Sequence, residues 1–181
     1  MERCRMVFSG SGGQGVITAA IIIAEAAVVH ENLVAAQSQL YGAEARGGAT
    51  RSDVVISESQ ISYPKVIQPN ILVCLTQVSY NKFFPIVRPG GLLITDTRYV
   101  KTLRKVDALQ KEFPMYKTVV ETIGNPIVFN ICMLGTVIGL TGVVKFDSIL
   151  SVLKKRIPKG FLDINQKALE LGFEMGKNAA S

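Results

Sequence analysis

Residues 10–15 read Gly-Ser-Gly-Gly-Gln-Gly, and this cluster stands between a short apolar segment and a long one. Residues 5–9 predict a β-strand, and residues 16–29, apolar on nearly all sides, predict a buried helix. In that context the spacing Gly-x-Gly-x-x-Gly matches the dinucleotide-binding fingerprint. The alternative is a plain turn between a strand and a helix, but four glycines in six residues are more than such a turn requires.

Each glycine of this loop has a physical reason. The first permits a tight turn, the next two let the backbone approach a ligand without a Cβ in the way, and the last lets the helix pack on the strand. Unpaired amides and the helix dipole favour negative charge at the start of the helix. The loop is therefore predicted to receive an anionic, phosphate-bearing group, with these site residues: Gly10, Ser11, Gly12, Gly13, Gln14 and Gly15.

The two commonest occupants of such loops are disfavoured. An NAD site needs a carboxylate at the end of the second strand, and the predicted strand 33–37 runs into Gln37-Ser38 with none. A phosphate-binding P-loop needs a Lys-Ser/Thr pair after the glycines, which is also missing. A free-standing nucleotide-binding module or NAD(P)-dependent dehydrogenase remains as the alternative function.

The order of the remaining segments predicts an α/β fold. Buried strands alternate with helices, which indicates a Rossmann-like open, mostly parallel sheet with helices on both faces. Residues 52–57 and 60–63 are predicted to form an antiparallel hairpin at its edge. The other predicted strands are 71–76, 92–95 and 116–122, and the other helices are 78–87, 103–113, 126–140, 148–156 and 163–176, the last two capped by Asp147 and Asp163. Asp96, after strand 92–95, is either a ligand contact or a helix cap.

Composition limits the class of protein. With 181 residues, 48% hydrophobic and 19% charged, the chain predicts one compact domain over residues 1–181. The net charge of +6 permits acidic partners, but the basic residues are dispersed, and the groups at 101–105 and 154–159 are interpreted as solvated helix faces, with a docking patch as the alternative. No nucleic acid is expected as a partner.

Cysteine and histidine usage argues against a metal site on this chain. The three cysteines have no regular spacing, no CxxC occurs, and His30 is the one histidine. Neither an iron–sulfur cluster nor zinc is expected here, and thiols without a disulfide framework suit a reducing compartment, the cytoplasm.

Residues 127–144 form an uncharged apolar stretch of 18 residues that contains Gly135-x-x-x-Gly139. A membrane span is one interpretation. Asn130, Thr136 and Thr141 within the stretch favour the other, a buried helix of a domain that does not enter a membrane. Asn130 needs a hydrogen-bond partner if buried, and backbone is favoured over a ligand.

A second polar cluster lies in the long loop 38–50. A planar guanidinium in such a loop can grip phosphate or carboxylate, and a nearby carboxylate can hold it in place or bond a cofactor of a neighbouring chain. The alternative is an ion pair that stabilises the loop. The residues of this cluster are Tyr41, Gly42, Glu44, Arg46 and Gly47.

Taken together, several motifs resemble the gamma subunit of 2-oxoacid:ferredoxin oxidoreductases. The pairing of Gly-Gly-Gln-Gly with Tyr-Gly-x-Glu-x-Arg-Gly-Gly some 25 residues later is the specific part. The resemblance runs from Met6 to about Gly172, and the other motifs are Tyr63-Pro64, Pro89-Gly90-Gly91 and Asn130-x-x-Met133-Leu134-Gly135.

The resemblance implies one subunit of an enzyme that oxidatively decarboxylates a 2-oxoacid to its acyl-CoA. Thiamine diphosphate with magnesium and the iron–sulfur clusters are then expected in alpha, beta and ferredoxin-like delta subunits, with ferredoxin as acceptor, and no catalytic residue on this chain alone. The glycine loop would receive coenzyme A, while Tyr41, Gly42, Glu44, Arg46, Gly47 and Asn130 would face that site or the neighbouring chain. The 2-oxoglutarate enzymes look nearest; pyruvate, 2-oxoisovalerate and indolepyruvate enzymes share the motifs.

Overall fold

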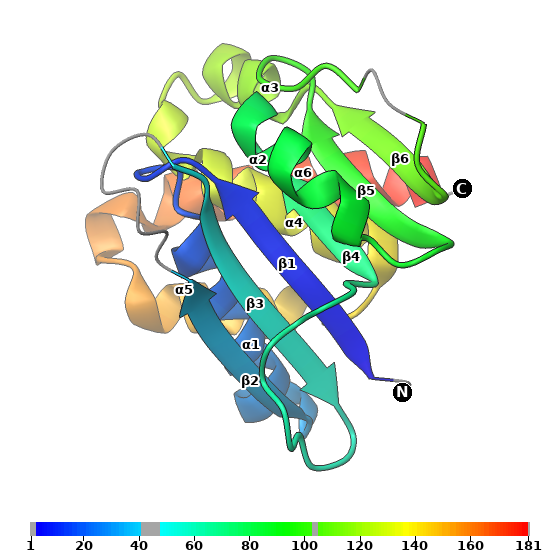
Figure 1. Cartoon of the computed structure of the whole chain (residues 1–181). Helices are drawn as coiled ribbons and strands as arrows, with labels where there is room; N and C mark the ends of the chain where they lie inside the picture. Colours follow the sequence, from blue (N-terminus) through cyan, green and yellow to red (C-terminus); the bar gives the residue numbers. More distant parts are fainter. Residues whose placement is uncertain (1–2, 41–47, 103–104, 181) are drawn as a thin grey trace.

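A mixed six-stranded sheet forms the centre of the molecule (Figure 1). The computed structural model describes residues 3–40, 48–102 and 105–180. Strand order is β2-β3-β1-β4-β5-β6; β1, β4, β5 and β6 are parallel, and β3 runs antiparallel to its neighbours β1 and β2. The strands are β1 (Cys4–Gly10), β2 (Val34–Leu40), β3 (Thr50–Ser57), β4 (Ile71–Cys74), β5 (Gly91–Asp96) and β6 (Ala108–Phe113).

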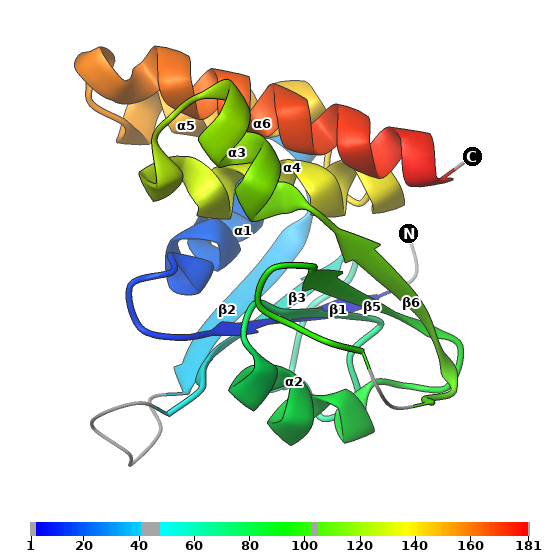
Figure 2. The same ribbon diagram turned by 90° about the horizontal axis from the view of Figure 1, so that it is seen from above.

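Helices cover both faces of this sheet, as Figure 2 shows. Helix α2 (Gln77–Phe83), continued by the 3₁₀ turn η1 (Phe84–Ile86), covers one face. The other face carries α1 (Val16–Glu31), α3 (Met115–Thr122), the 3₁₀ turn η2 (Pro126–Val128), α4 (Phe129–Thr141), α5 (Phe146–Arg156) and α6 (Lys159–Ala180). The predicted α/β class, with its mostly parallel sheet and antiparallel edge, is confirmed.

The composition of the antiparallel edge differs from the prediction. It consists of β2 and β3, whereas residues 60–63 form no strand, so the predicted pairing of 52–57 with 60–63 is wrong. Strand β3 lies inside the sheet, and its central residues Val54, Val55 and Ile56 are all buried. A continuous apolar run is typical of a strand covered on both faces, whereas an edge strand of a hairpin tends to alternate.

In two neighbouring segments the predicted secondary structure is wrong, because the predicted helix contains a strand and the predicted strand is a helix. Residues 108–113 form strand β6 instead of the end of a helix, because pairing with β5 outweighs the helix preference of Leu, Gln, Lys and Glu. Residues 115–122 form helix α3 instead of a strand. Its Met115 and Val119 are buried four residues apart, which is helical spacing, despite the β-branched residues that suggested a strand.

The predicted caps of the last two helices are also wrong. Helix α5 has Lys145 at its N-cap, and Asp147 lies within its first turn. Helix α6 begins at Lys159, directly after Pro158, so Asp163 lies inside it. Proline supports the first turn of a helix, which explains why α6 begins earlier than the acidic residue suggested.

The long apolar stretch of the sequence forms η2 and α4, whose side chains are largely buried against the rest of the molecule. Within the described residues, no helix is long and apolar enough to cross a membrane. The Gly-x-x-x-Gly spacing instead brings two backbones together. A Cβ on Gly135 would lie 2.3 Å from the Leu169 carbonyl oxygen of α6, and one on Gly172 would lie 1.9 Å from the Cys132 carbonyl oxygen of α4.

We predict that Gly172→Ala lowers the free energy of unfolding by about 1–3 kcal/mol. The added methyl group overlaps backbone atoms of α4, and these cannot rotate away as a flexible side chain could. Thermal or urea unfolding measures the effect. Gly160→Ala is the matched control in the same helix, since a Cβ there meets nothing within 4 Å. The control is expected to be neutral or to stabilise by up to about 1 kcal/mol. Equal behaviour of the two variants would contradict the close approach of α4 and α6.

Candidate functional site

The glycine loop lies at the carboxyl end of β1, and the side chain of Gln14 fixes its shape. Gln14 Oε1 accepts a hydrogen bond from the Ser11 amide (2.8 Å), and Gln14 Nε2 donates one to the carbonyl oxygen of Leu75 (3.2 Å), just beyond β4. The Leu75 amide in turn donates to the Ser9 carbonyl oxygen (2.9 Å). The loop is thus anchored across the ends of β1 and β4, the place where open α/β sheets bind ligands.

Two of the glycines face side chains inside the protein. A Cβ on Gly10 would lie 2.5 Å from Gln14 Oε1. Gly15, the N-cap of α1, has φ +72°, and a Cβ there would lie 2.4 Å from Nδ2 of Asn130 on α4. Asn130 Nδ2 donates to the Gly15 carbonyl oxygen (3.3 Å), so the predicted backbone partner of this amide is confirmed.

The other two glycines face open space. Gly12 and Gly13 are exposed, and a Cβ on either would meet nothing within 4 Å. They border a hollow of about 530 Å³ whose other lining residues are Ser11, Gly15, Val16, Ile17, Thr18 and Thr50. Gly10 and Gln14, both predicted site residues, support the loop from behind.

The start of α1 supplies hydrogen-bond donors to this hollow. The first amides of a helix have no acceptor four residues back, and Gly15 provides no side-chain cap. The helix dipole adds partial positive charge at the same end. Ser11, Thr18 and Thr50, which carry hydroxyl groups, also line the hollow. Helix N-termini with unpaired amides are common binding sites for anions in proteins.

The second predicted cluster, Tyr41, Gly42, Glu44, Arg46 and Gly47, lies outside the described residues. Among the described residues that follow it, Thr50 of β3 pairs with Gly10 of β1. The sequence pattern alone did not single out Thr50 or Thr18 as site residues. Thr50 reaches the site only because β3 returns beside β1, and pairing of that kind has no local sequence signal.

Asp96 has a structural role. Its fully buried carboxylate accepts hydrogen bonds from the Arg98 amide (2.9 Å) and from the Tyr116 amide (2.8 Å) in the first turn of α3. Burial raises the pKa of Asp96, and these amides offset part of the effect. Asp96 is not the N-cap residue of a helix, since Pro114 has that position in α3, but its carboxylate accepts an amide of the first turn of that helix from a distant part of the chain.

Among the described residues, no group of three or more His, Cys, Asp or Glu side chains is close enough together to hold a metal ion. The cysteines are free thiols. Burial raises the pKa of Cys74 and of Cys132 to about 12, so neither is a ready nucleophile at neutral pH.

We predict that Gly15→Ala lowers the free energy of unfolding by about 2 kcal/mol or more, because the methyl group meets Asn130 and an L-residue is strained at positive φ. Chemical denaturation measures the loss. In the double variant Gly15→Ala/Asn130→Ala the overlaps with Nδ2 and Cγ of residue 130 are gone, whereas its Cβ (2.9 Å) and the backbone strain remain. Part of the loss should therefore be recovered relative to the sum of the two single variants. Strict additivity of the two changes would contradict the contact.

Comparison with known proteins places the fold and loop in a family. Residues 5–175 match the family model described as pyruvate ferredoxin/flavodoxin oxidoreductase. The chain is 42% identical, over 93% of its length and 91% of the relative's, to the 2-oxoglutarate synthase subunit KorC of Methanocaldococcus jannaschii.

Solved structures agree. The gamma subunit of a keto/oxoacid ferredoxin oxidoreductase from Geobacter sulfurreducens is 36% identical and superposes with a TM-score of 0.90 over 99% of both chains. A 2-oxoglutarate:ferredoxin oxidoreductase from Magnetococcus marinus, at 17% identity, shares the fold over 98% of this chain and 32% of its own (TM-score 0.88). This chain therefore belongs to the pyruvate ferredoxin/flavodoxin oxidoreductase family, as a gamma subunit of the 2-oxoacid:ferredoxin oxidoreductases.

Proposed function

We propose that this chain is the gamma subunit of a 2-oxoglutarate:ferredoxin oxidoreductase and that its glycine loop binds the phosphate groups of coenzyme A. The observation that carries the proposal is the open backbone at Gly12 and Gly13, in front of the first turn of α1. The choice of 2-oxoglutarate rests on the name of the M. jannaschii relative. Membership of a family of enzyme subunits favours this proposal over the alternative of a free-standing dinucleotide-dependent enzyme.

The residues of the hollow fit such a ligand. Coenzyme A carries a pyrophosphate and a further phosphate, and a glycine backbone lets these oxygens approach the amides closely. About 530 Å³ is within the usual range of ligand pockets. The described lining residues are uncharged, so amide dipoles and hydroxyls supply the attraction, and Arg46 from the adjoining segment is proposed to add a guanidinium. The M. marinus enzyme was solved with coenzyme A bound, which makes this the ligand to test.

The role of the chain in this proposal is positioning. Amides at the start of α1 hold the phosphate end of the ligand, and Gln14 and Asn130 keep those amides in place. Coenzyme A, when bound, supplies the thiol that accepts the acyl group. We propose that thiamine diphosphate, magnesium and the iron–sulfur clusters lie in alpha, beta and delta subunits, that ferredoxin is the acceptor, and that Tyr41, Gly42, Glu44 and Gly47 face the ligand or the neighbouring subunit.

The proposal includes the domain organisation of the chain and its compartment in the cell. The family match covers residues 5–175, which supports one gamma-type domain over residues 1–181. Free cysteines suit the reducing cytoplasm.

We predict that Gly12→Asp raises the KM for coenzyme A about tenfold or more in the assembled enzyme, equivalent to about 1.4 kcal/mol of binding free energy. The new carboxylate would occupy the proposed anion site and repel the phosphate groups of coenzyme A. The fold should tolerate the change, since a Cβ at this position meets no atom within 4 Å. Steady-state kinetics with coenzyme A as the varied substrate measure the effect, with the KM for 2-oxoglutarate as an internal reference.

Gly160→Asp is the matched control, because it adds the same charge at a glycine of α6 that also has open space around it. The control should leave the KM for coenzyme A unchanged. If Gly12→Asp also leaves it unchanged while the enzyme assembles normally, the glycine loop is structural and the ligand lies elsewhere.

A further inference from the structure

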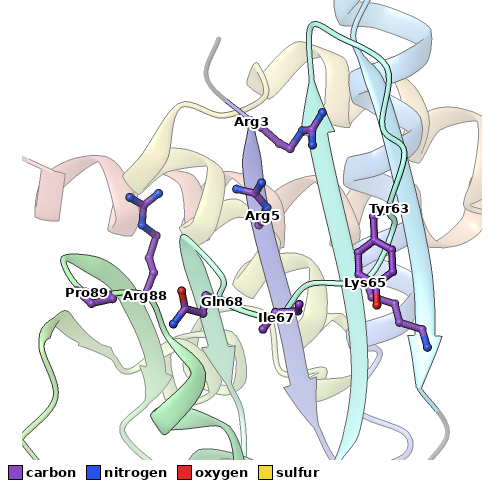
Figure 3. Close-up of a pocket in the computed structure, with 8 residues that line it drawn as sticks. All are labelled: Arg3, Arg5, Tyr63, Lys65, Ile67, Gln68, Arg88 and Pro89. Atoms are coloured by element: carbon purple, nitrogen blue, oxygen red, sulfur yellow. The ribbon is translucent and has the colours of Figure 1, made fainter.

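A second hollow, of about 670 Å³, lies mainly around the amino ends of β1, β4 and β5 (Figure 3). Arg3 and Arg5 lie at the amino end of β1, and roughly 17 Å of extended strand separates Arg5 from the glycine loop at the carboxyl end. The lining residues come from three separate parts of the chain: Arg3 and Arg5; Tyr63, Lys65, Ile67 and Gln68; Arg88 and Pro89.

Hydrogen bonds fix the backbone that carries these side chains. The Arg5 amide donates to Asn70 Oδ1 (2.9 Å), and the Asn70 amide donates to the Arg5 carbonyl oxygen (2.8 Å). The Arg88 amide donates to the Pro69 carbonyl oxygen (3.1 Å). The start of β1, the segment 58–70 and the turn before β5 are therefore tied together.

An ion pair on β3 anchors the middle of segment 58–70. Asp53 is fully buried and pairs with Arg51 at 2.6 Å. Its second oxygen accepts the Val66 amide (2.8 Å), and Arg51 also donates to the Val66 carbonyl oxygen. Lys65 and Ile67 flank this anchored residue, so the hollow has walls that are held in place before any partner binds.

The hollow is strongly basic. Four of its eight lining residues are cationic (Arg3, Arg5, Lys65 and Arg88), and no lining residue is acidic. None of the ion pairs found among the described residues involves a cation that lines the hollow, and Arg3 donates to the carbonyl oxygen of Gln60. Like charges repel one another, and the described residues that line the hollow include no acid to offset them. This arrangement favours occupation by a partner that carries several negative charges.

The spread of the cations and the exposed apolar side chains of the hollow favour a protein segment as the negatively charged partner. Figure 3 shows Arg88 and Lys65 on opposite sides of Ile67, so the cations spread across the hollow and do not converge on one point. Tyr63 and Ile67 are 57% and 73% exposed among them. Exposed aromatic and aliphatic side chains beside arginines are typical of protein interfaces, and guanidinium groups bind carboxylates bidentately.

We propose that this basic hollow docks an acidic segment of another subunit of the complex, with carboxylates on the arginines and apolar side chains on Tyr63 and Ile67. The proposal depends on membership of a family of enzyme subunits and is independent of where coenzyme A binds. The test measures association of this chain with its partner subunits, so its result can be interpreted even if coenzyme A does not bind to the glycine loop.

The first test is affinity between this chain and the complex of its partner subunits, measured at low and at physiological salt. The variant Lys65→Glu/Arg88→Glu should bind at least about tenfold more weakly and should lose much of the salt dependence. The matched control Lys154→Glu/Lys167→Glu makes the same charge change at exposed residues of α5 and α6 and should bind as the unmodified chain does. Equal weakening by both variants, or by neither, would overturn the proposal.

The second test identifies the partner. A carbodiimide, which joins an amine directly to a carboxylate, should link Lys65 to an Asp or Glu of another subunit in the assembled enzyme, and a charge reversal at that carboxylate should restore the affinity of the Lys65→Glu/Arg88→Glu variant. Links from Lys65 only to carboxylates of its own chain would contradict docking. Saturable binding of pyrophosphate or ATP to the full chain, abolished by Arg88→Glu, would show a small-anion site and overturn the proposal as well.

Discussion

The side chain of Asn130 fills the space that a Cβ on residue 15 would need, and the shape of the glycine loop depends on that contact. Gly15 adopts a left-handed conformation that turns the chain from β1 into α1. Asn130 is in place because α4 is packed against α6 so closely that carbonyl oxygens of one helix occupy the Cβ positions of glycines on the other. The C-terminal helix therefore supports, through α4, a site more than one hundred residues earlier in the chain.

Two hollows lie along the same strand, β1. At the carboxyl end of β1, the glycine loop and the first turn of α1 border the hollow that we propose receives phosphate groups. At the amino end, arginines and a lysine from three segments border a basic hollow. Strand β3 contributes to both hollows, because Thr50 lines the first, and the nearby pair of Arg51 and Asp53 anchors the wall of the second.

The features that the sequence could predict were those with a local cause. The glycine loop, the buried helix α1 and the apolar strands β4 and β5 each have a pattern within a few residues of chain. Helix α3 and strand β6 were interchanged because their types depend on distant partners: Asp96 holds the first turn of α3, and β5 pairs with β6. The basic hollow has no sequence signature, since residues 3, 5, 65 and 88 meet only in three dimensions.

The most direct test of the central claim is to follow the backbone amide resonances of the isotope-labelled full chain by NMR while coenzyme A is added. The account predicts that the largest shifts occur at Gly12, Gly13 and the first turn of α1, that they saturate, and that pyrophosphate reproduces part of them. No shift at millimolar coenzyme A, or shifts confined to the basic hollow around Arg5 and Arg88, would contradict the assignment of the glycine loop as the site that receives the phosphates.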